Sequence, residues 1–213
     1  VRVIVKPTTF KQDEILFQGV SKGGASLVAT EDLPSSMLAS TIVDFSGLAD
    51  MSLTDLQKAL TGKNVSHSVS INNNTEVVSG SSTVKDLETL LQINYLSFTA
   101  PRRDEEAYQT LMSVLNSQLA NRDKNPKAAF SDSIQMMAND HSSRIVLQDL
   151  AWLEKVNLDK ALEVYKARFA NPADFVFTFV GNVDPADKVF QKMVCTWLGG
   201  LKTSKKKESV RDN

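Results

Sequence analysis

The chain has 213 residues, of which 42% are hydrophobic and 23% are charged, so it can bury a substantial core. The 24 Lys and Arg residues nearly balance the 25 Asp and Glu residues, and the net charge is −1. This balance provides no field that would attract nucleic acid or an anionic membrane, so we expect neither partner. Cys195 is the only cysteine, which excludes an internal disulfide and a cysteine-based zinc site. No stretch approaches the roughly 20 apolar residues of a membrane span.

Local patterns predict the secondary structure along the chain. Runs of β-branched residues predict strands, apolar residues at helical spacing predict helices, and Gly or Pro marks the ends of both. In chain order, we expect strands at 1–6 and 14–21, helices at 34–45 and 52–60, strands at 65–71 and 75–82, helices at 83–95, 104–119, 126–138, 145–154 and 158–169, a strand at 174–181, and a helix from 184 to 198.

The strongest of these patterns is a β-hairpin. Residues 65–71 alternate strictly, with His67 and Val69 among the residues of one face and serines on the other. The turn at 72–74 consists of three asparagines, and residues 75–82 follow as the partner strand. Two strands joined by so short a turn are antiparallel.

Strands and helices do not alternate regularly, which favours an α+β fold over a doubly wound sheet. We expect a two-layer sandwich in which helices cover a mainly antiparallel sheet. Residues 174–181 are apolar on both faces and predict a central strand. No repeat or linker divides residues 1–201, so we expect a single domain there. Residues 202–213, which include Lys202 and Lys205–Lys207, predict a basic, solvated tail that acts as a linker.

The two histidines are poor candidates for zinc ligands. A catalytic zinc needs three protein ligands, usually with two close together on one element. His67 and His141 are far apart, and neither has a second His or a Glu at helical ligand spacing. We interpret His67 as a packed or partly exposed sheet histidine, because it shares a face with apolar strand residues. His141 lies in a polar segment, where helix capping or simple exposure is expected.

Other potentially reactive groups have structural interpretations. Ser79–Ser82 lacks the Gly-x-Ser-x-Gly elbow of a nucleophile and lies where a strand gives way to a helix, so we expect capping serines. Gly23-Gly24 lacks the Gly-Lys-Ser/Thr ending of a phosphate loop. Glu105-Glu106 complements a helix dipole. Cys195 lies on an apolar helix stripe, which predicts a small core residue.

Several segments, in their order and spacing, resemble the pitrilysin-type (inverzincin) zinc metallopeptidase family. The segments are residues 2–17 with Gly23-Gly24, the run from Asp86 through Pro101-Arg102 to Ala107, and residues 158–169 with 175–184. The resemblance extends over about residues 1–201, and it is to the large bacterial zinc proteases built from four homologous domains. It implies that this chain is a non-catalytic domain from the C-terminal half of such a protease.

The resemblance also implies where zinc ligands would lie. In the active domain of these peptidases, the helix after the second strand carries His-x-x-Glu-His, and a later helix supplies a glutamate ligand. The corresponding positions here fall near Leu38, Thr41 and Ile42, and near Asn116. Residues 33–50 contain no His or Glu, and the later helix has no acid near Asn116. We therefore expect no catalytic residue, metal ligand or cofactor in this domain, and zinc in the catalytic domain of the parent chain.

The function that the resemblance implies is proteolysis of peptides by the parent chain, with this domain inactive alone. The domain would form part of the substrate chamber wall and support the catalytic half. Its expected partners are the other domains of that chain and the peptide substrate, and bacterial relatives favour a periplasmic or cell-envelope location. Two alternatives stay open: a scaffold of the same fold with no peptidase role, as in the core subunits of respiratory complexes, and a free-standing peptide-binding protein.

Overall fold

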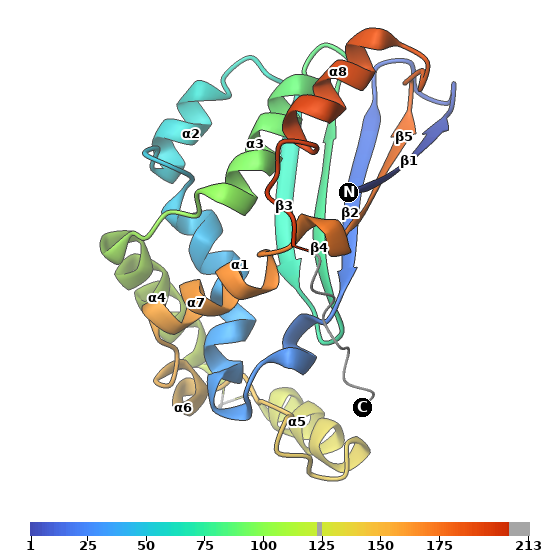
Figure 1. Ribbon diagram of the computed structural model, residues 1–213. Helices are drawn as coiled ribbons and strands as arrows, with labels where there is room; N and C mark the ends of the chain where they lie inside the picture. Colours follow the sequence, from blue (N-terminus) through green and yellow to red (C-terminus); the bar gives the residue numbers. More distant parts are fainter. Residues whose placement is uncertain (123–124, 205–213) are drawn as a thin grey trace.

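A five-stranded sheet forms one layer of the structure, and helices form the other (Figure 1). In this computed structural model, residues 1–122 and 125–204 are described. The strand order is β1-β5-β2-β4-β3, in which β1 and β5 pair in parallel and the other neighbours are antiparallel. The strands are β1 (Arg2–Pro7), β2 (Ile15–Lys22), β3 (Val65–Ile71), β4 (Thr75–Ser82) and β5 (Val176–Gly181).

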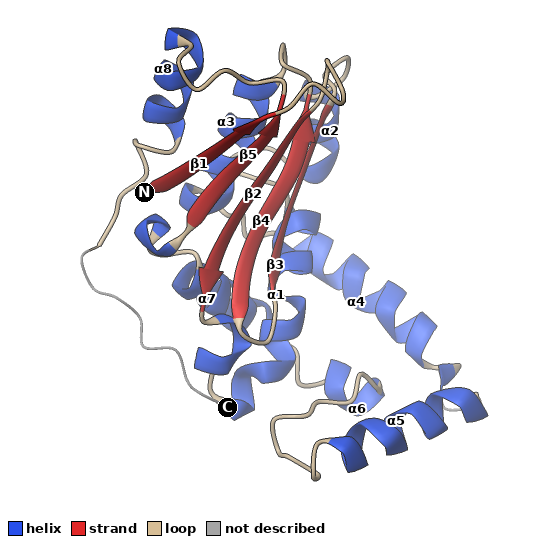
Figure 2. Ribbon diagram, turned by 90° about the vertical axis from the view of Figure 1, so that its right-hand side faces the viewer, coloured by secondary structure: helices blue, strands red, loops and turns tan. Residues whose placement is uncertain are grey.

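The helices lie behind the sheet in Figure 2 and leave its other face uncovered. They are α1 (Leu33–Ser46), α2 (Leu53–Ala59), α3 (Leu87–Thr99), α4 (Glu105–Leu119), α5 (Pro126–Ala138), α6 (Leu150–Leu153), α7 (Leu158–Arg168) and α8 (Lys188–Trp197). This arrangement confirms the predicted α+β sandwich with a mainly antiparallel sheet. Residues 1–201 were predicted to be one domain, and that boundary stays a prediction. The tail prediction falls largely on residues 205–213, which lie outside the described residues.

The core lies between the sheet and the helix layer. Phenylalanines of β2 and β5 fill its centre, and the rings of Phe17 and Phe177 stack with their centroids 5.8 Å apart. Phe179 continues the same row on β5 and contacts Phe190 of α8 edge to face. Burial alternates along β5, because every second side chain points into this core. The intervening residues of β5 are only half-buried, since they face the uncovered side of the sheet.

Most predicted elements occur within a residue or two of their expected bounds, and the hairpin of β3 and β4 has the predicted ends. The helix predicted from residue 83 begins later, at Leu87, because Thr83 and Asp86 form a turn. In that turn the Thr83 hydroxyl accepts from the Asp86 N–H at 3.2 Å and donates to Asp86 Oδ2 at 2.9 Å. The helix predicted from residue 184 likewise begins at Lys188, where Asp187 caps it by accepting from the N–H of Val189.

The helix predicted over residues 145–154 was wrong for most of its length, because only α6 is helical there. Arg144 draws the preceding chain to another part of the molecule, as its guanidinium donates to the carbonyl oxygens of Ala25 (2.7 Å) and Val28 (3.1 Å). Val146 then packs against the small apolar cluster that contains Leu33. These long-range contacts hold residues 145–148 out of the helix that their local pattern favours.

A buried carboxylate connects three segments at one end of the sheet. Glu76, at the start of β4, is fully buried, and its Oε1 accepts from the Gly24 N–H at 2.7 Å. The same oxygen lies 3.4 Å from the guanidinium of Arg168 at the end of α7. Gly24 has a φ of +58°, and a Cβ at that position would collide with the carbonyl oxygen of Asn72. The conformation of this loop therefore requires glycine.

A half-buried histidine, His67, lies on β3, on the face that meets the helices. Its Nε2 atom is buried and has no hydrogen-bond partner within the described part of the chain, and neither does the carboxamide of the buried Asn94 on α3. Burial lowers the pKa of His67 to about 4, and the neighbouring Asn94 carboxamide opposes this shift in part. The imidazole is therefore neutral in the folded protein at neutral pH. The prediction of a packed sheet histidine agrees with this environment.

Replacing Glu76 tests the buried connection. Because Glu76→Ala leaves the mostly buried Arg168 guanidinium without this carboxylate, we expect the free energy of unfolding in urea to fall by about 3 to 5 kcal/mol. Glu14→Ala serves as the control, since it removes an exposed ion pair to Lys11, and it should cost less than about 1 kcal/mol. Equal losses in the two variants would contradict the role given to Glu76.

The low pKa of His67 makes stability depend on pH. Its folded pKa of about 4 lies below the unfolded value of 6.5, so the unfolded chain binds more protons between these pH values. Stability should therefore decrease as the pH falls from about 6.5 to 4, by on the order of 2 to 3 kcal/mol. His67→Gln should remove this component in urea unfolding measured at several pH values, whereas His141→Gln should not. Identical pH profiles for wild type and His67→Gln would show that His67 titrates normally.

Candidate functional site

The region where the resemblance places zinc ligands is occupied by the apolar core. Helix α1 packs against α4, and Leu38 and Ile42 of α1 belong to the same buried cluster as Leu111 of α4. Ile42 is 0% and Leu111 is 3% exposed, so both side chains belong to the packed core. Thr41 is half-buried, and Asn116 points to solvent. These side chains offer no combination of ligands that zinc prefers.

The described part of the chain contains no group of three or more His, Cys, Asp or Glu residues that could hold a metal ion. The structure does not bring the two histidines together. His67 is half-buried on the face of β3 that meets α3, with its Nε2 atom buried, whereas His141 is exposed just beyond the end of α5. His141 has a φ of +51°, and its N–H donates to the carbonyl of Met136 at 2.9 Å, so its backbone closes the helix end.

The serines of Ser79–Ser82 were predicted to cap a helix, and this prediction was wrong. They lie within β4, where Ser79 and Ser81 exchange hydroxyl hydrogen bonds with Ser68 (2.9 Å) and Ser66 (2.8 Å) across the hairpin. The Cys195 prediction was also wrong, because the thiol is exposed. Cys195 follows Val194 by one residue, and therefore lies about 100° around α8 from the side that packs on the core.

The remaining sequence candidates have structural roles. Gly23 and Gly24 lie against the hairpin turn and the Glu76 carboxylate. Glu105 occupies the first turn of α4, as expected, and forms an exposed ion pair with Arg103 at 3.1 Å. The helix cap itself is Asp104, whose Oδ1 accepts from the Ala107 N–H at 3.0 Å. None of these groups is positioned beside another to form a catalytic set.

The outer edge of the sheet at β3 presents unpaired backbone groups. The N–H of Asn72 donates to the carbonyl of Thr75 at 2.8 Å, and the N–H of Thr83 donates to the carbonyl of Asn64 at 3.2 Å. Because hydrogen-bonded pairs alternate along an antiparallel hairpin, the residues of β3 that bond to β4 are the even-numbered ones. The odd-numbered residues direct their N–H and C=O groups away from β4. These backbone groups have no hydrogen-bond partner within residues 1–122 and 125–204, and they belong to Val65, His67, Val69 and Ile71.

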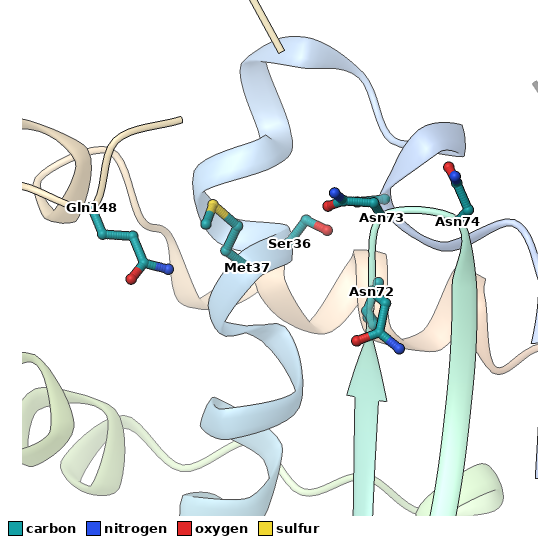
Figure 3. A pocket seen from close by; sticks show the side chains of 8 residues that line it. Ser36, Met37, Asn72, Asn73, Asn74 and Gln148 are labelled. Atoms are coloured by element: carbon teal, nitrogen blue, oxygen red, sulfur yellow. The ribbon is translucent and has the colours of Figure 1, made fainter. Parts of the chain in front are cut away.

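A polar groove opens where this edge ends. Two adjoining cavities of about 480 and 500 Å³ share Ala25, Met37 and Asn73 in their linings and so form one groove. The groove lies between the hairpin turn, the first half of α1 and the segment that follows α5. Figure 3 shows the part beside the turn, where the Ser36 side chain points from α1 toward Asn73 and Gln148 lies on the other side of Met37.

Ser36 differs from a typical groove residue because its polar side chain is buried. Ser36 is 2% exposed, and its Oγ has no hydrogen-bond partner among residues 1–122 and 125–204. The preceding residue differs, because Ser35 Oγ accepts from the Asn157 N–H at 3.0 Å. The sequence offered no signal for this distinction, since both serines lie in one run and only tertiary structure separates their partners. The asparagines at 72–74 were recognised as a turn but not as the wall of a groove.

No family model matches the sequence. The chain is 26% identical over 202 residues to a protein of Arabidopsis thaliana described as zinc protease PQQL-like, a match that covers 94% of this chain and 18% of that protein. The chain thus spans about a fifth of the length of this curated relative. No helix among the described residues is long and apolar enough to cross a membrane.

Solved structures of several proteases and peptidase domains share the fold. The periplasmic protease PqqL from Escherichia coli matches with a TM-score of 0.80 and 20% identity over 98% of this chain and 23% of that one. A peptidase M16 inactive domain from Pseudomonas fluorescens matches with a TM-score of 0.72 and 12% identity over 98% of this chain and 50% of that one. The resemblance inferred from the sequence is therefore confirmed: over nearly its whole length, this chain is similar in sequence and fold to a domain of the pitrilysin-type (M16) zinc proteases.

Proposed function

We propose that this chain is a non-catalytic domain of a zinc metallopeptidase, where it forms part of the wall of the substrate chamber and supports the catalytic half. The observation that carries the proposal is the apolar character of the contacting helices α1 and α4, whose Ile42 and Leu111 are buried in the core at or near the positions where the resemblance places zinc ligands. Without ligands, these helices cannot lower the pKa of a water molecule or polarise a peptide carbonyl.

The uncovered face of the sheet supports the role as a wall. Side chains from several strands reach this face, and the exposed ones include Ile4 of β1 and Leu16 of β2. Toward β3 the same face carries the paired serines of the hairpin. A broad surface of mixed polarity suits repeated, weak contact with unfolded peptides better than tight binding of one ligand. Its partners in this role are the other domains of the parent chain and the peptide substrate.

The location of the protein is part of this proposal. A fold neighbour is described as a periplasmic protease, and this favours a periplasmic or cell-envelope location for the protein that carries this domain. Zinc is the expected cofactor of the parent chain, held in a different domain. A scaffold of the same fold would retain the α1–α4 packing but would occur in a parent chain without His-x-x-Glu-His.

Zinc binding tests the proposal directly. We expect purified chain to contain far less than one zinc per molecule, measured by plasma emission spectroscopy, and to leave an unstructured peptide uncleaved in a mass-spectrometric assay. A specific site saturated at 100 times its Kd would raise the Tm by roughly 5 to 10 °C. Added zinc should therefore leave the Tm unchanged. One bound zinc per chain together with peptide cleavage would refute the proposal.

The free edge of β3 favours a second candidate function, the binding of extended peptides. An extended peptide can add a strand to an exposed sheet edge through main-chain hydrogen bonds. The outward N–H and C=O groups of β3 provide such an edge over about 20 Å, the length of a seven-residue strand. The serine side chains beside them keep the neighbouring surface polar. This function is compatible with a chamber wall that holds a substrate in extended form.

A proline substitution tests the edge. Val65→Pro removes an N–H that points outward, so it should weaken binding of a fluorescent, uncharged, extended peptide about three- to tenfold while leaving the strand pairing intact. Binding is measured by fluorescence anisotropy. Ser66→Pro is the matched control, because it removes an N–H on the β4 side and should lower the urea midpoint. Unchanged peptide affinity in Val65→Pro would exclude binding along this edge.

A further inference from the structure

The groove beside the hairpin turn is a candidate site that the proposed function leaves unexplained. It begins at Ile71, the last residue of β3, and continues past the asparagine turn to the segment around Arg144. It is therefore continuous with the free edge of the sheet. A peptide paired to β3 would enter it on passing the end of the strand.

Ser36 indicates that this groove is built to receive a polar ligand. Ser36 lines the cavity, and its Oγ is buried without a hydrogen-bond partner among the residues that the structure describes. A helical serine commonly satisfies itself by donating to the carbonyl four residues earlier, as Ser46 does to Ile42 at 2.8 Å. Ser36 does not bond in this way, and its side chain points toward Asn73 in the wall of the groove (Figure 3). An apolar residue of similar size would avoid this unsatisfied hydroxyl.

The chemistry of the lining identifies the class of ligand. Most of its polar side chains are carboxamides, which present both a donor and an acceptor. They come from the hairpin turn, from α5 with its C-terminal end, and from the 145–148 segment, and they are Asn72, Asn73, Asn74, Gln135, Asn139 and Gln148. Such a set matches the N–H and C=O of peptide groups and of Asn or Gln side chains. It does not match an acid or a base.

Charge is nearly absent from the groove. Arg144 is the one charged residue in the lining, and its guanidinium already donates to the carbonyl oxygens of Ala25 and Val28. No Asp, Glu or Lys lines either cavity. Met37, which is partly exposed between the polar groups, supplies a flexible apolar floor that can adjust to different side chains.

We propose that this groove binds an uncharged, extended segment of polypeptide, whose backbone or Asn and Gln side chains hydrogen-bond to Ser36 and the surrounding carboxamides. The proposal rests on the peptide-binding function suggested for the β3 edge and extends it beyond the end of the strand. The groove would hold the part of the peptide that follows the strand-paired segment. It would favour neutral polar residues over acidic or basic ones.

Ser36→Ala gives an unusual combination of expected results. The substitution removes an unsatisfied buried hydroxyl, so the urea midpoint should stay equal or rise. Loss of the hydrogen bond to the ligand should weaken binding about three- to tenfold. The probe is a fluorescein-labelled, end-blocked peptide of alternating Thr, Val and Gln residues, long enough to pass the end of β3, titrated by anisotropy against the whole 213-residue chain.

Ser35→Ala is the matched control, one residue away on the same helix. It removes the acceptor of the Asn157 N–H, so it should lower stability and leave peptide affinity unchanged below the unfolding transition. Asn73→Ala should weaken binding as Ser36→Ala does. A probe with Glu in place of Gln should bind more weakly to wild type, and the side-chain NH₂ signals of Asn73 and Gln148 should shift in NMR spectra only with the neutral probe.

The outcomes separate this proposal from the one on which it rests. If Val65→Pro weakens binding and Ser36→Ala does not, the groove is excluded while the edge remains a binding site. Absence of binding in the wild type would reject both peptide sites, but it would leave the zinc-free chamber role to its own test. Equal binding of the neutral and the acidic probe would reject the class of ligand proposed here.

Discussion

The position of the hairpin relative to the helix layer depends on one buried carboxylate. Glu76 accepts from the Gly24 N–H and lies beside the Arg168 guanidinium, so it joins β4, the loop after β2 and the end of α7. A charge buried in this way is costly unless it is paired, which makes each partner necessary to the others. The same loop pairs with the hairpin turn through the Ala25 N–H and the Asn72 carbonyl at 2.8 Å. The shape of the groove follows from these bonds.

The domain shares its overall fold with pitrilysin-type peptidase domains, but its contact between α1 and α4 does not resemble a zinc site. The sheet and its helices have the arrangement of a pitrilysin-type peptidase domain, yet the contact of α1 with α4 is filled by apolar side chains. Apolar packing between these helices stabilises the fold. A cavity lined by polar ligands would destabilise it, because buried polar groups cost free energy unless they are bonded. The fold is therefore compatible with the non-catalytic role proposed for this domain.

The sequence predicts the fold better than it predicts the groove that we propose as a binding site. Strict alternation over residues 65–71 predicted the hairpin correctly, because a half-buried strand imposes a period of two. The segment 145–148 misled the helix prediction because Arg144 bonds to carbonyls more than 100 residues away, which no local pattern reports. Ser36 could not be found for the same reason. Ser36 is of interest because its hydroxyl lacks a hydrogen-bond partner in the part of the chain that the structure describes, and only the folded structure shows which groups surround it.

The serines along the hairpin have a consequence for solubility. A free sheet edge is a template on which other chains can pair, and apolar side chains around it turn such pairing into aggregation. Here the hydroxyls of Ser66 and Ser68 are already hydrogen-bonded to serines of β4. The surface beside the edge therefore offers few side-chain interactions to a second copy of the chain. A strand that joins this edge would be held by main-chain bonds alone. Such an association would be reversible, which suits the peptide binding proposed for this edge.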